Sequence, residues 1–427
     1  MNSLTKKIYL LLLIFMMVFP TYFINVKYIL LGLLLILMIF SILLSENKKI
    51  NIHKSIFYWT LVLTSTGSIY IMYGLYNGYS DATDLTSIHM IYPWIFLFII
   101  TLVDKTEMIE KIFNVILFST FIIEIYCICY VLSTMNIIPS YVFPTIYIGQ
   151  NINLIGGISF SVPSLGTLIF TLPLIFTKIC IDNRNFSRKK LLTSWIAFIL
   201  GIIVLLLSGR KVLATIILIT PIILCCYTFF LSNKQFKNIN IRLLKISAFT
   251  LILMSILISL LTFYLGFNIS EFNKILIEGF NFNSNNISSD SYIRNLQFNV
   301  LLQEWSKNPI FGKGLGATAQ DLIRNKDFAW AFELQYMSYL MSFGLVGFLI
   351  FASSFLWVIN KANLMMKKNA RITYYLLPVL IGMISFLIAN ATNPYLIKFD
   401  FMWTIFIPIS FVNFYLTTKE ETIICEE

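Results

Sequence analysis

Two adjacent cations, Arg210 and Lys211, lie in a short connection, 208–211, between two long apolar stretches. A guanidinium and an ammonium group side by side at a membrane surface are suited to bind a phosphate or pyrophosphate group. The simpler alternative is that both side chains reach lipid head groups. A second polar cluster, Lys398 and Asp400, occupies a connection near the C-terminus. We therefore treat Arg210, Lys211 and Lys398 as candidate anion-binding residues.

Arg294 is a further candidate because of its place in a predicted helix. Asp290 or Ser291 can cap this helix, and Asn308-Pro309 ends it. Its apolar stripe has spacings of three and four and consists of Ile293, Leu296, Val300 and Leu301. A cation in the first turn opposes the helix dipole. Arg294 is therefore better placed to serve an anion or a partner than its own helix, with a solvated surface arginine as the alternative.

Three glycines follow this helix in the sequence NPIFGKGLGA, 308–317. No strand is predicted before them, so we exclude a dinucleotide-binding motif. Two interpretations stay open. The loop could bring its backbone amides close to a phosphate, or the glycines could simply close a turn.

The composition places these residues in a membrane protein. The chain has 427 residues, of which 58% are hydrophobic and 12% charged, and its mean hydropathy is +0.82. These values exclude a water-soluble fold. Apolar runs of roughly 20 residues, the length of a membrane-spanning helix, repeat along the whole chain. We predict twelve spans, at 8–24, 28–45, 55–74, 88–103, 112–135, 154–177, 191–207, 212–231, 243–266, 334–359, 374–392 and 401–416.

The predicted fold class is an all-α polytopic membrane protein with one large extracytoplasmic loop. Spans one to nine occupy 1–266, the loop 267–333, spans ten to twelve 334–416, and a cytoplasmic tail 417–427. Glu124 is the one charged residue in the interior of a predicted span. A carboxylate at that depth is either a functional group or a protonated helix contact.

The distribution of charge predicts the orientation. With the N-terminus in the cytoplasm, 21 of the 31 Lys and Arg residues lie on the inner side and 10 on the outer side, six of them in the large loop. This is a strong positive-inside bias, which places both termini in the cytoplasm. The net charge of +11 is therefore a topology signal, and no nucleic-acid partner follows from it. With two histidines and no paired cysteine motif, we expect neither a metal nor a cofactor.

Several motifs, in their order along the chain, resemble the bacterial O-antigen ligase and polymerase (Wzy-type) superfamily. They are GGISFSVPSLGTL at 156–168, LSGRK at the hairpin, NPIFGKGLG after Arg294, and ELQYMSYLMSFGLVGF. The ligases of that family carry a histidine eleven residues before the glycine that opens GLxG. Counted back from Gly344, that position is Glu333, as in the repeat-unit polymerases. The chain departs from the family in its shortened SGSR motif and in lacking the arginine spacing of a polymerase loop.

The resemblance implies a GT-C-like glycosyltransferase in the bacterial cytoplasmic (inner) membrane. It would transfer a growing glycan from polyprenyl pyrophosphate to a sugar hydroxyl of a new lipid-linked repeat unit. That reaction needs cations for the departing pyrophosphate and a base for the hydroxyl. We assign pyrophosphate binding to Arg210 and Arg294, assisted by Lys211. Glu333 would be the base or the group that orients the acceptor. Further contacts to pyrophosphate or glycan are expected from Lys211, Lys313, Arg324 and Lys398.

The product would be lipopolysaccharide O-antigen, capsule or another exopolysaccharide. The expected partners are the polyprenyl-pyrophosphate-linked oligosaccharide and membrane lipids, with a chain-length regulator and a flippase as further candidates. Three alternatives stay open at this stage. One is a non-catalytic scaffold for envelope assembly, which would leave Arg210 and Lys211 unexplained. An O-antigen ligase, which joins polymer to a lipid core, would share the same site. A lipid-linked sugar flippase or secondary transporter belongs to another class and would carry several buried charges along a pathway.

Overall fold

The computed structural model of the chain is entirely helical in the residues that it describes. These are 3–44, 50–134, 137–139, 162–181, 188–208, 210–231, 237–265, 289–319, 322 and 328–424. Within them, ten helices are long and apolar enough to cross a membrane. A helix satisfies its own backbone hydrogen bonds, so it is stable in hydrocarbon where loops are not. The chain is therefore a multi-pass membrane protein, as its composition predicts.

Two of the twelve predicted spans fall on shorter helices. The first corresponds to α1 (Ser3–Val18), which has 16 residues, and the sixth to α6 (Leu165–Ile181), which has 17. Both are shorter than the roughly 20 residues that cross a bilayer without tilt or thinning. The first part of the sixth predicted span, 154–161, lies outside the described residues. By length and composition, the described residues thus contain ten helices that could cross a membrane, two fewer than the twelve predicted spans.

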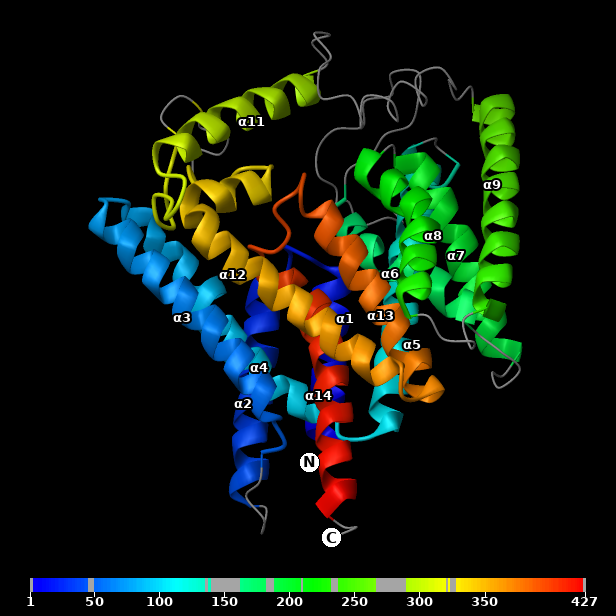
Figure 1. Ribbon diagram of the computed structural model, residues 1–427. Helices are drawn as coiled ribbons and strands as arrows, with labels where there is room; N and C mark the ends of the chain where they lie inside the picture. Colours follow the sequence, from blue (N-terminus) through cyan, green and yellow to red (C-terminus); the bar gives the residue numbers. More distant parts are fainter. Residues whose placement is uncertain are drawn as a thin grey trace. The chain divides into compact units, whose positions relative to one another are not determined.

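The chain divides into two compact units, each built from three separate stretches. The first unit comprises Met1–Lys48, Thr106–Phe280 and Met366–Phe386. Its helices (Figure 1) are α1, α2 (Ile24–Leu43), α5 (Thr106–Thr134), α6, α7 (Arg188–Ser208), α8 (Lys211–Leu231), α9 (Lys237–Leu265) and most of α13 (Ala370–Ala389).

Helix α6 forms the core of the first unit. It packs against α5, α7, α8 and α9, and all of its residues except Lys178 and Ile181 are buried. By contrast, α2 leaves a row of large apolar side chains exposed, including Ile29 at 69% and Ile39 at 56%. An exposed apolar face of this size is expected on a helix that borders lipid. The predicted hairpin at 208–211 is confirmed, since α7 ends at Ser208 and α8 begins at Lys211.

The second unit comprises Lys49–Lys105, Asn281–Met365 and Leu387–Glu427. It contains α3 (Lys54–Tyr76), a composite helix Ser80–Leu102, α11 (Ser289–Lys307), α12 (Gln335–Met366), the short η7 (Phe399–Phe401) and α14 (Trp403–Ile424). The composite helix consists of η1 (Ser80–Leu85), η2 (Ser87–Ile91), α4 (Tyr92–Ile99) and η3 (Ile100–Leu102). Figure 1 shows α11 lying across the end of the unit at which α12 begins. The described part of the predicted large loop therefore packs within this unit.

Helix α12 is broken at Gly344, whose φ of 61° and ψ of −171° are not helical. The break leaves two carbonyls and two amides of α12 without helical partners. The loop 308–317 supplies them: the amides of Lys313 and Gly314 donate to Met341 O and Ser342 O, each at 2.9 Å. The amides of the two residues after the break donate back, from Leu345 to Pro309 O at 2.9 Å and from Val346 to Ile310 O at 3.1 Å. Broken helices at membrane depth require such cover from protein.

The glycines of the loop permit this contact because the backbones touch directly. A Cβ on Gly314, which has a φ of 93°, would lie 2.3 Å from the amide nitrogen of Gly74 in α3. A Cβ on Gly312 would lie 2.4 Å from the amide nitrogen of Gly344. The amide of Leu315 also donates to Tyr70 O of α3 at 2.9 Å. We call the loop 308–317 together with Gly74 and Gly344 the glycine clasp.

Candidate functional site

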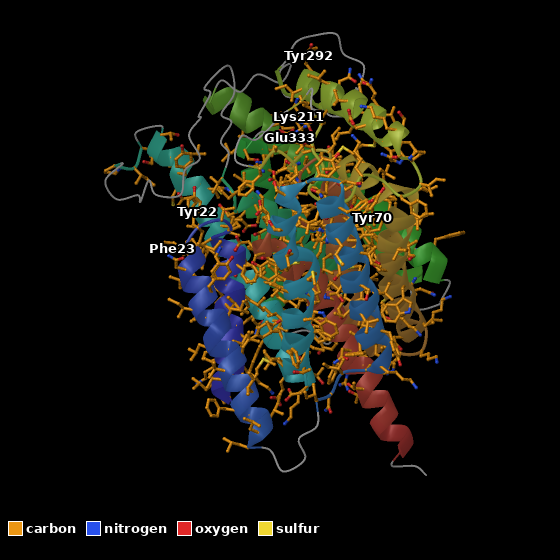
Figure 2. All side chains as sticks on the ribbon, turned by 90° about the vertical axis from the view of Figure 1, so that its left-hand side faces the viewer. Tyr22, Phe23, Tyr70, Lys211, Tyr292 and Glu333 are labelled. Carbon is orange, nitrogen blue, oxygen red and sulfur yellow. The ribbon has the colours of Figure 1, made fainter. Side chains whose placement is uncertain are left out.

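The predicted catalytic residues Arg294 and Glu333 lie side by side in the second unit. Arg294 Nε donates to Glu333 Oε2 at 3.2 Å, although 39 positions separate the two residues. Each side chain is about a quarter exposed, at 24% and 23%, so a bound substrate could reach both. Figure 2 shows Glu333 toward the same end of the unit as Tyr292 of α11. Because α11 begins at Ser289, Arg294 lies just beyond its first turn, and the anion with which it pairs is Glu333.

The backbone at Glu333 is held by a buried side chain of α11. The amide of Glu333 donates to Gln297 Oε1 at 3.1 Å, and Gln297 is fully buried. A cluster of Leu301, Ala317, Phe332 and their neighbours packs beneath the helix. This fixes both members of the ion pair, since Arg294 and Gln297 lie one turn apart on α11. Sequence reasoning missed Gln297, although a glutamine one turn before the apolar Leu301 was the available signal.

The buried face of α11 differs from the predicted apolar stripe. The predicted end before Asn308 is confirmed, but the helix begins at Ser289, so the predicted caps Asp290 and Ser291 lie inside it. The most buried residues are Gln297, Leu301 and Glu304, whereas Leu296 of the predicted stripe is 39% exposed. The reason is that α11 packs on the glycine clasp and on the residues before α12, which supply polar partners. The capping side chains at 290 and 291 lie outside the description.

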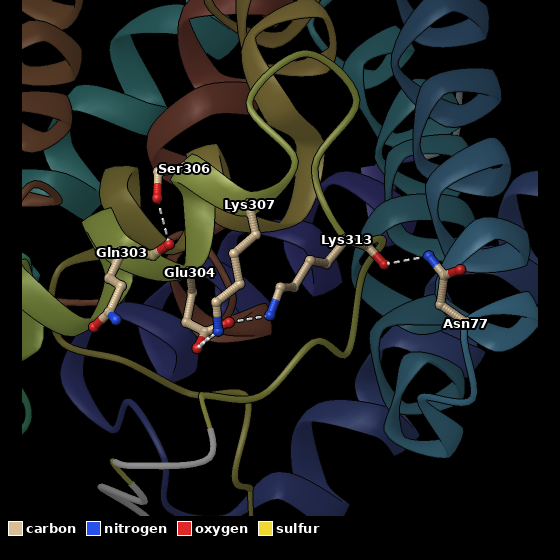
Figure 3. A network of polar contacts seen from close by, with 6 residues as sticks. All are labelled: Asn77, Gln303, Glu304, Ser306, Lys307 and Lys313. Atoms are coloured by element: carbon tan, nitrogen blue, oxygen red, sulfur yellow. Dashed lines mark hydrogen bonds and ion pairs between the residues drawn. The ribbon is translucent and has the colours of Figure 1, made fainter.

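Lys313 of the glycine clasp is paired within the protein. Glu304 of α11, whose side chain is 7% exposed, accepts hydrogen bonds from Lys313 Nζ and, at 2.7 Å, from Lys307 Nζ. The carbonyl of Lys313 in turn accepts from Asn77 Nδ2 at 2.9 Å (Figure 3). Burial alone would raise the pKa of Glu304, but the hydrogen bonds from Lys307 and Lys313 outweigh it and hold the pKa below 4.5. Lys313 thus ties α11 to the clasp.

We expect Glu304→Gln to lower the free energy of unfolding by about 2 kcal/mol at neutral pH, the scale of a hydrogen bond to a charged group. A carboxylate with a lowered folded pKa stabilises above its ordinary pKa, and this stabilisation is lost as pH falls through the folded value. The difference between wild type and Glu304→Gln should therefore shrink below pH 4.5. Unfolding of the two purified proteins at several pH values between pH 7 and pH 3 measures this difference in free energy of unfolding. The control Lys307→Ala removes an ammonium group whose side chain is 55% exposed and leaves Lys313 on Glu304, so it should cost less; equal costs would contradict this account.

The other predicted binding residues belong to neither of these two ion pairs. Arg210 and Lys211, both half-buried, belong to the first unit, where the Arg210 amide donates to Ser208 Oγ at 3.4 Å. Lys398 is exposed in the turn before η7. Arg324 lies outside the described residues. The structure therefore joins Arg294 with Glu333 and joins Lys313 with Glu304.

Glu124 is fully buried in α5, and neither carboxyl oxygen has a hydrogen-bond partner among the described residues. Its Oε1 would lie 2.9 Å from a Cβ built on Gly201, so α7 approaches it closely. The sequence correctly placed Glu124 inside a spanning helix.

A small polar cavity in the second unit was not predicted. His89, Trp330, Gln335 and Ser338 are among its lining residues. The buried Nε2 of His89 and Nε1 of Trp330 have no hydrogen-bond partner in the described part of the chain. The cavity is about the size of one water molecule. Of these residues, Trp330 lies three positions before Glu333 in the sequence.

No protein-family model matches this chain, and no curated protein matches it in sequence. In the described residues, no group of three or more His, Cys, Asp or Glu side chains is arranged to hold a metal ion. The site is thus defined by its own chemistry, a guanidinium and a carboxylate that are adjacent, partly exposed and held in place by Gln297.

Proposed function

We propose that the chain polymerises lipid-linked oligosaccharide repeat units, and that Arg294 and Glu333 carry the reaction. The observation that supports the proposal is their contact at 3.2 Å, each about a quarter exposed. Glycosyl transfer from a pyrophosphate needs a cation for the leaving group and a base for the acceptor. The resemblance to Wzy-type proteins, carried by short motifs, also supports it.

In the proposed step, an acceptor sugar hydroxyl attacks the anomeric carbon of the donor glycan. The bond from that carbon to the pyrophosphate oxygen breaks, and the hydroxyl proton passes to the carboxylate of Glu333. The polyprenyl pyrophosphate leaves with its charge stabilised by Arg294, whose guanidinium can form two parallel hydrogen bonds to a phosphate. Pyrophosphate carries more negative charge than a carboxylate, so it would compete with Glu333 for Arg294. Substrate binding would then free Glu333 to act as base.

The topology belongs to the same proposal. We place the chain in the bacterial cytoplasmic membrane with twelve spans, both termini in the cytoplasm and the 267–333 loop outside. The strong excess of Lys and Arg on one side of the predicted spans supports this orientation. The GT-C-like architecture and the contributions of Arg210, Lys211, Arg324 and Lys398 to pyrophosphate or glycan binding are parts of the same proposal.

Deletion of the gene in its host tests the reaction class. We expect the surface glycan of the deletion strain to carry a single repeat unit, with the long-chain ladder restored by the wild-type gene. Electrophoresis of the extracted glycan measures chain length. Unattached polymer would instead indicate the ligase alternative, and loss of all surface repeat units would indicate a flippase. Either result would contradict the proposal.

A further inference from the structure

A pocket in the first unit lies where α5, α7 and α13 begin and α6 ends. The entrance of the pocket is polar, and its lining residues there include Glu110, Lys178, Lys190 and Tyr375. The apolar floor lies one to two turns deeper and consists of Ile116, Leu117, Leu174 and Ile175. Because α5 runs away from this end and α6 runs toward it, these four side chains lie at a similar depth. The pocket thus combines a charged entrance with an apolar interior.

The ammonium group of Lys178 is held at the entrance by aromatic rings. Its Nζ lies 3.5 Å from the centre of the Phe113 ring and 4.8 Å from that of Tyr374. Cation–π contacts of this kind orient the ammonium group of a lysine without neutralising its charge. The rings already face a cation, so the pocket is not suited to a quaternary amine. A positively charged entrance of this kind favours an anionic ligand.

Lys190 of α7 supplies a second cation to the lining of the pocket. Its Nζ lies 3.2 Å from Glu110 Oε2, and Tyr375 donates to the other carboxylate oxygen at 3.1 Å. The Lys190 and Glu110 side chains are 45% and 49% exposed, so this ion pair contributes little to stability. A phosphate could therefore draw Lys190 from Glu110 at low cost. Arg188 and Lys189 add exposed positive charge beside it.

We propose that this pocket binds an anionic phospholipid, with its phosphate between Lys178 and Lys190 and the start of an acyl chain on the floor formed by Leu117, Leu174 and their neighbours. The apolar floor is the reason to expect a lipid, because a free phosphate ion would gain nothing from it. The pocket lies at the end of the first unit whose connections carry most of the Lys and Arg residues. This is the predicted cytoplasmic side, where negatively charged lipids attract basic segments. The proposal rests on the orientation proposed above but not on the proposed reaction.

Native mass spectrometry of the purified full chain tests the site. The protein is titrated with phosphatidylglycerol and, separately, with phosphatidylcholine of the same acyl chains. We expect the anionic lipid to bind more tightly, and Lys178→Gln and Lys190→Gln each to weaken its binding about tenfold without changing the binding of phosphatidylcholine. Lys189→Gln, an exposed neighbour that does not line the pocket, is the matched control and should behave as wild type.

Lys190→Gln keeps the test informative if Lys178→Gln fails to fold, because Lys190 is exposed. A further arm measures thermal unfolding with inorganic phosphate at the same concentration as the lipid. Equal stabilisation by inorganic phosphate would overturn the assignment to a lipid. Equal affinity for the two lipids, or unchanged anionic-lipid binding in Lys190→Gln, would overturn the site itself.

Discussion

Gly314→Ala should prevent the second unit from folding. The new Cβ would lie 2.3 Å from the amide nitrogen of Gly74, and the φ of 93° is strained for alanine. The loop would have to move away from α3 and α12, which would break the hydrogen bonds of Gly314 to Ser342 O and of Leu315 to Tyr70 O. Each buried amide left without a partner costs about 1–3 kcal/mol. The total exceeds about 4 kcal/mol, a large share of the stability of most proteins.

Variants at two other glycines distinguish backbone strain from the steric overlap of the new Cβ. Gly78 has a φ of +88° but open space around its Cβ position, so Gly78→Ala tests backbone strain alone and should cost about 1–2 kcal/mol. Gly32 lies within α2 with open space and no unusual φ. Gly32→Ala should stabilise the protein by about 1 kcal/mol. Membrane-fraction protein level and thermal unfolding rank the three variants, and a Gly314→Ala protein as stable as Gly78→Ala would contradict the clasp.

Arg294→Ala and Glu333→Gln should each abolish long-chain glycan while leaving the protein folded. Loss of a general base lowers a rate by about 10²–10⁴-fold, and loss of the cation that stabilises a leaving group has a similar effect. The ion pair itself is partly exposed, so its removal should change stability by less than about 1 kcal/mol. Glycan chain length in a complemented deletion strain, with protein level measured alongside, tests both variants.

Lys307→Ala is the matched control for this pair. Lys307 lies on the same helix as Arg294, its side chain is exposed, and its ion-pair partner is Glu304 rather than Glu333. The control strain should retain the wild-type ladder. Long-chain glycan from both the Arg294→Ala and the Glu333→Gln strains would remove these residues from the proposed reaction.

The sequence predicted those parts of the fold that local patterns determine. Apolar runs gave the helical class and most span positions, and the Asn308-Pro309 pair gave the end of α11. The start of the composite helix at Ser80 was missed, because its first turns carry Asp81 and Asp84 and are not apolar. Periodicity gave the buried face of α11 only in part: Leu301 is buried as predicted, but Leu296 is exposed. The buried Gln297 and Glu304 were missed because their polar partners come from the Glu333 segment and the glycine clasp.

At the candidate site too, local sequence patterns identified single residues but not the contacts between them. Arg294 was selected because its charge opposes the dipole of its own helix, but its distance to Glu333 depends on how α11 packs, which no local pattern contains. The two interpretations of the loop 308–317 could not be separated from spacing alone. In the structure, the amides of Lys313, Gly314 and Leu315 donate to backbone carbonyls of α12 and α3. This favours loop closure over a phosphate cradle, because those amides are already engaged.

A charge exchange at the Arg294–Glu333 pair tests the central proposal most directly. The double variant Arg294→Glu with Glu333→Arg retains an ion pair at this position but reverses the roles of its two members. Purified protein is supplied with a polyprenyl-pyrophosphate-linked repeat unit, and the length of the glycan products is measured by mass spectrometry. We predict a ladder of polymer from wild type and only the single repeat from the exchanged protein, at equal thermal stability. A ladder from the exchanged protein would show that the pair has only a structural role and would contradict the proposed catalysis.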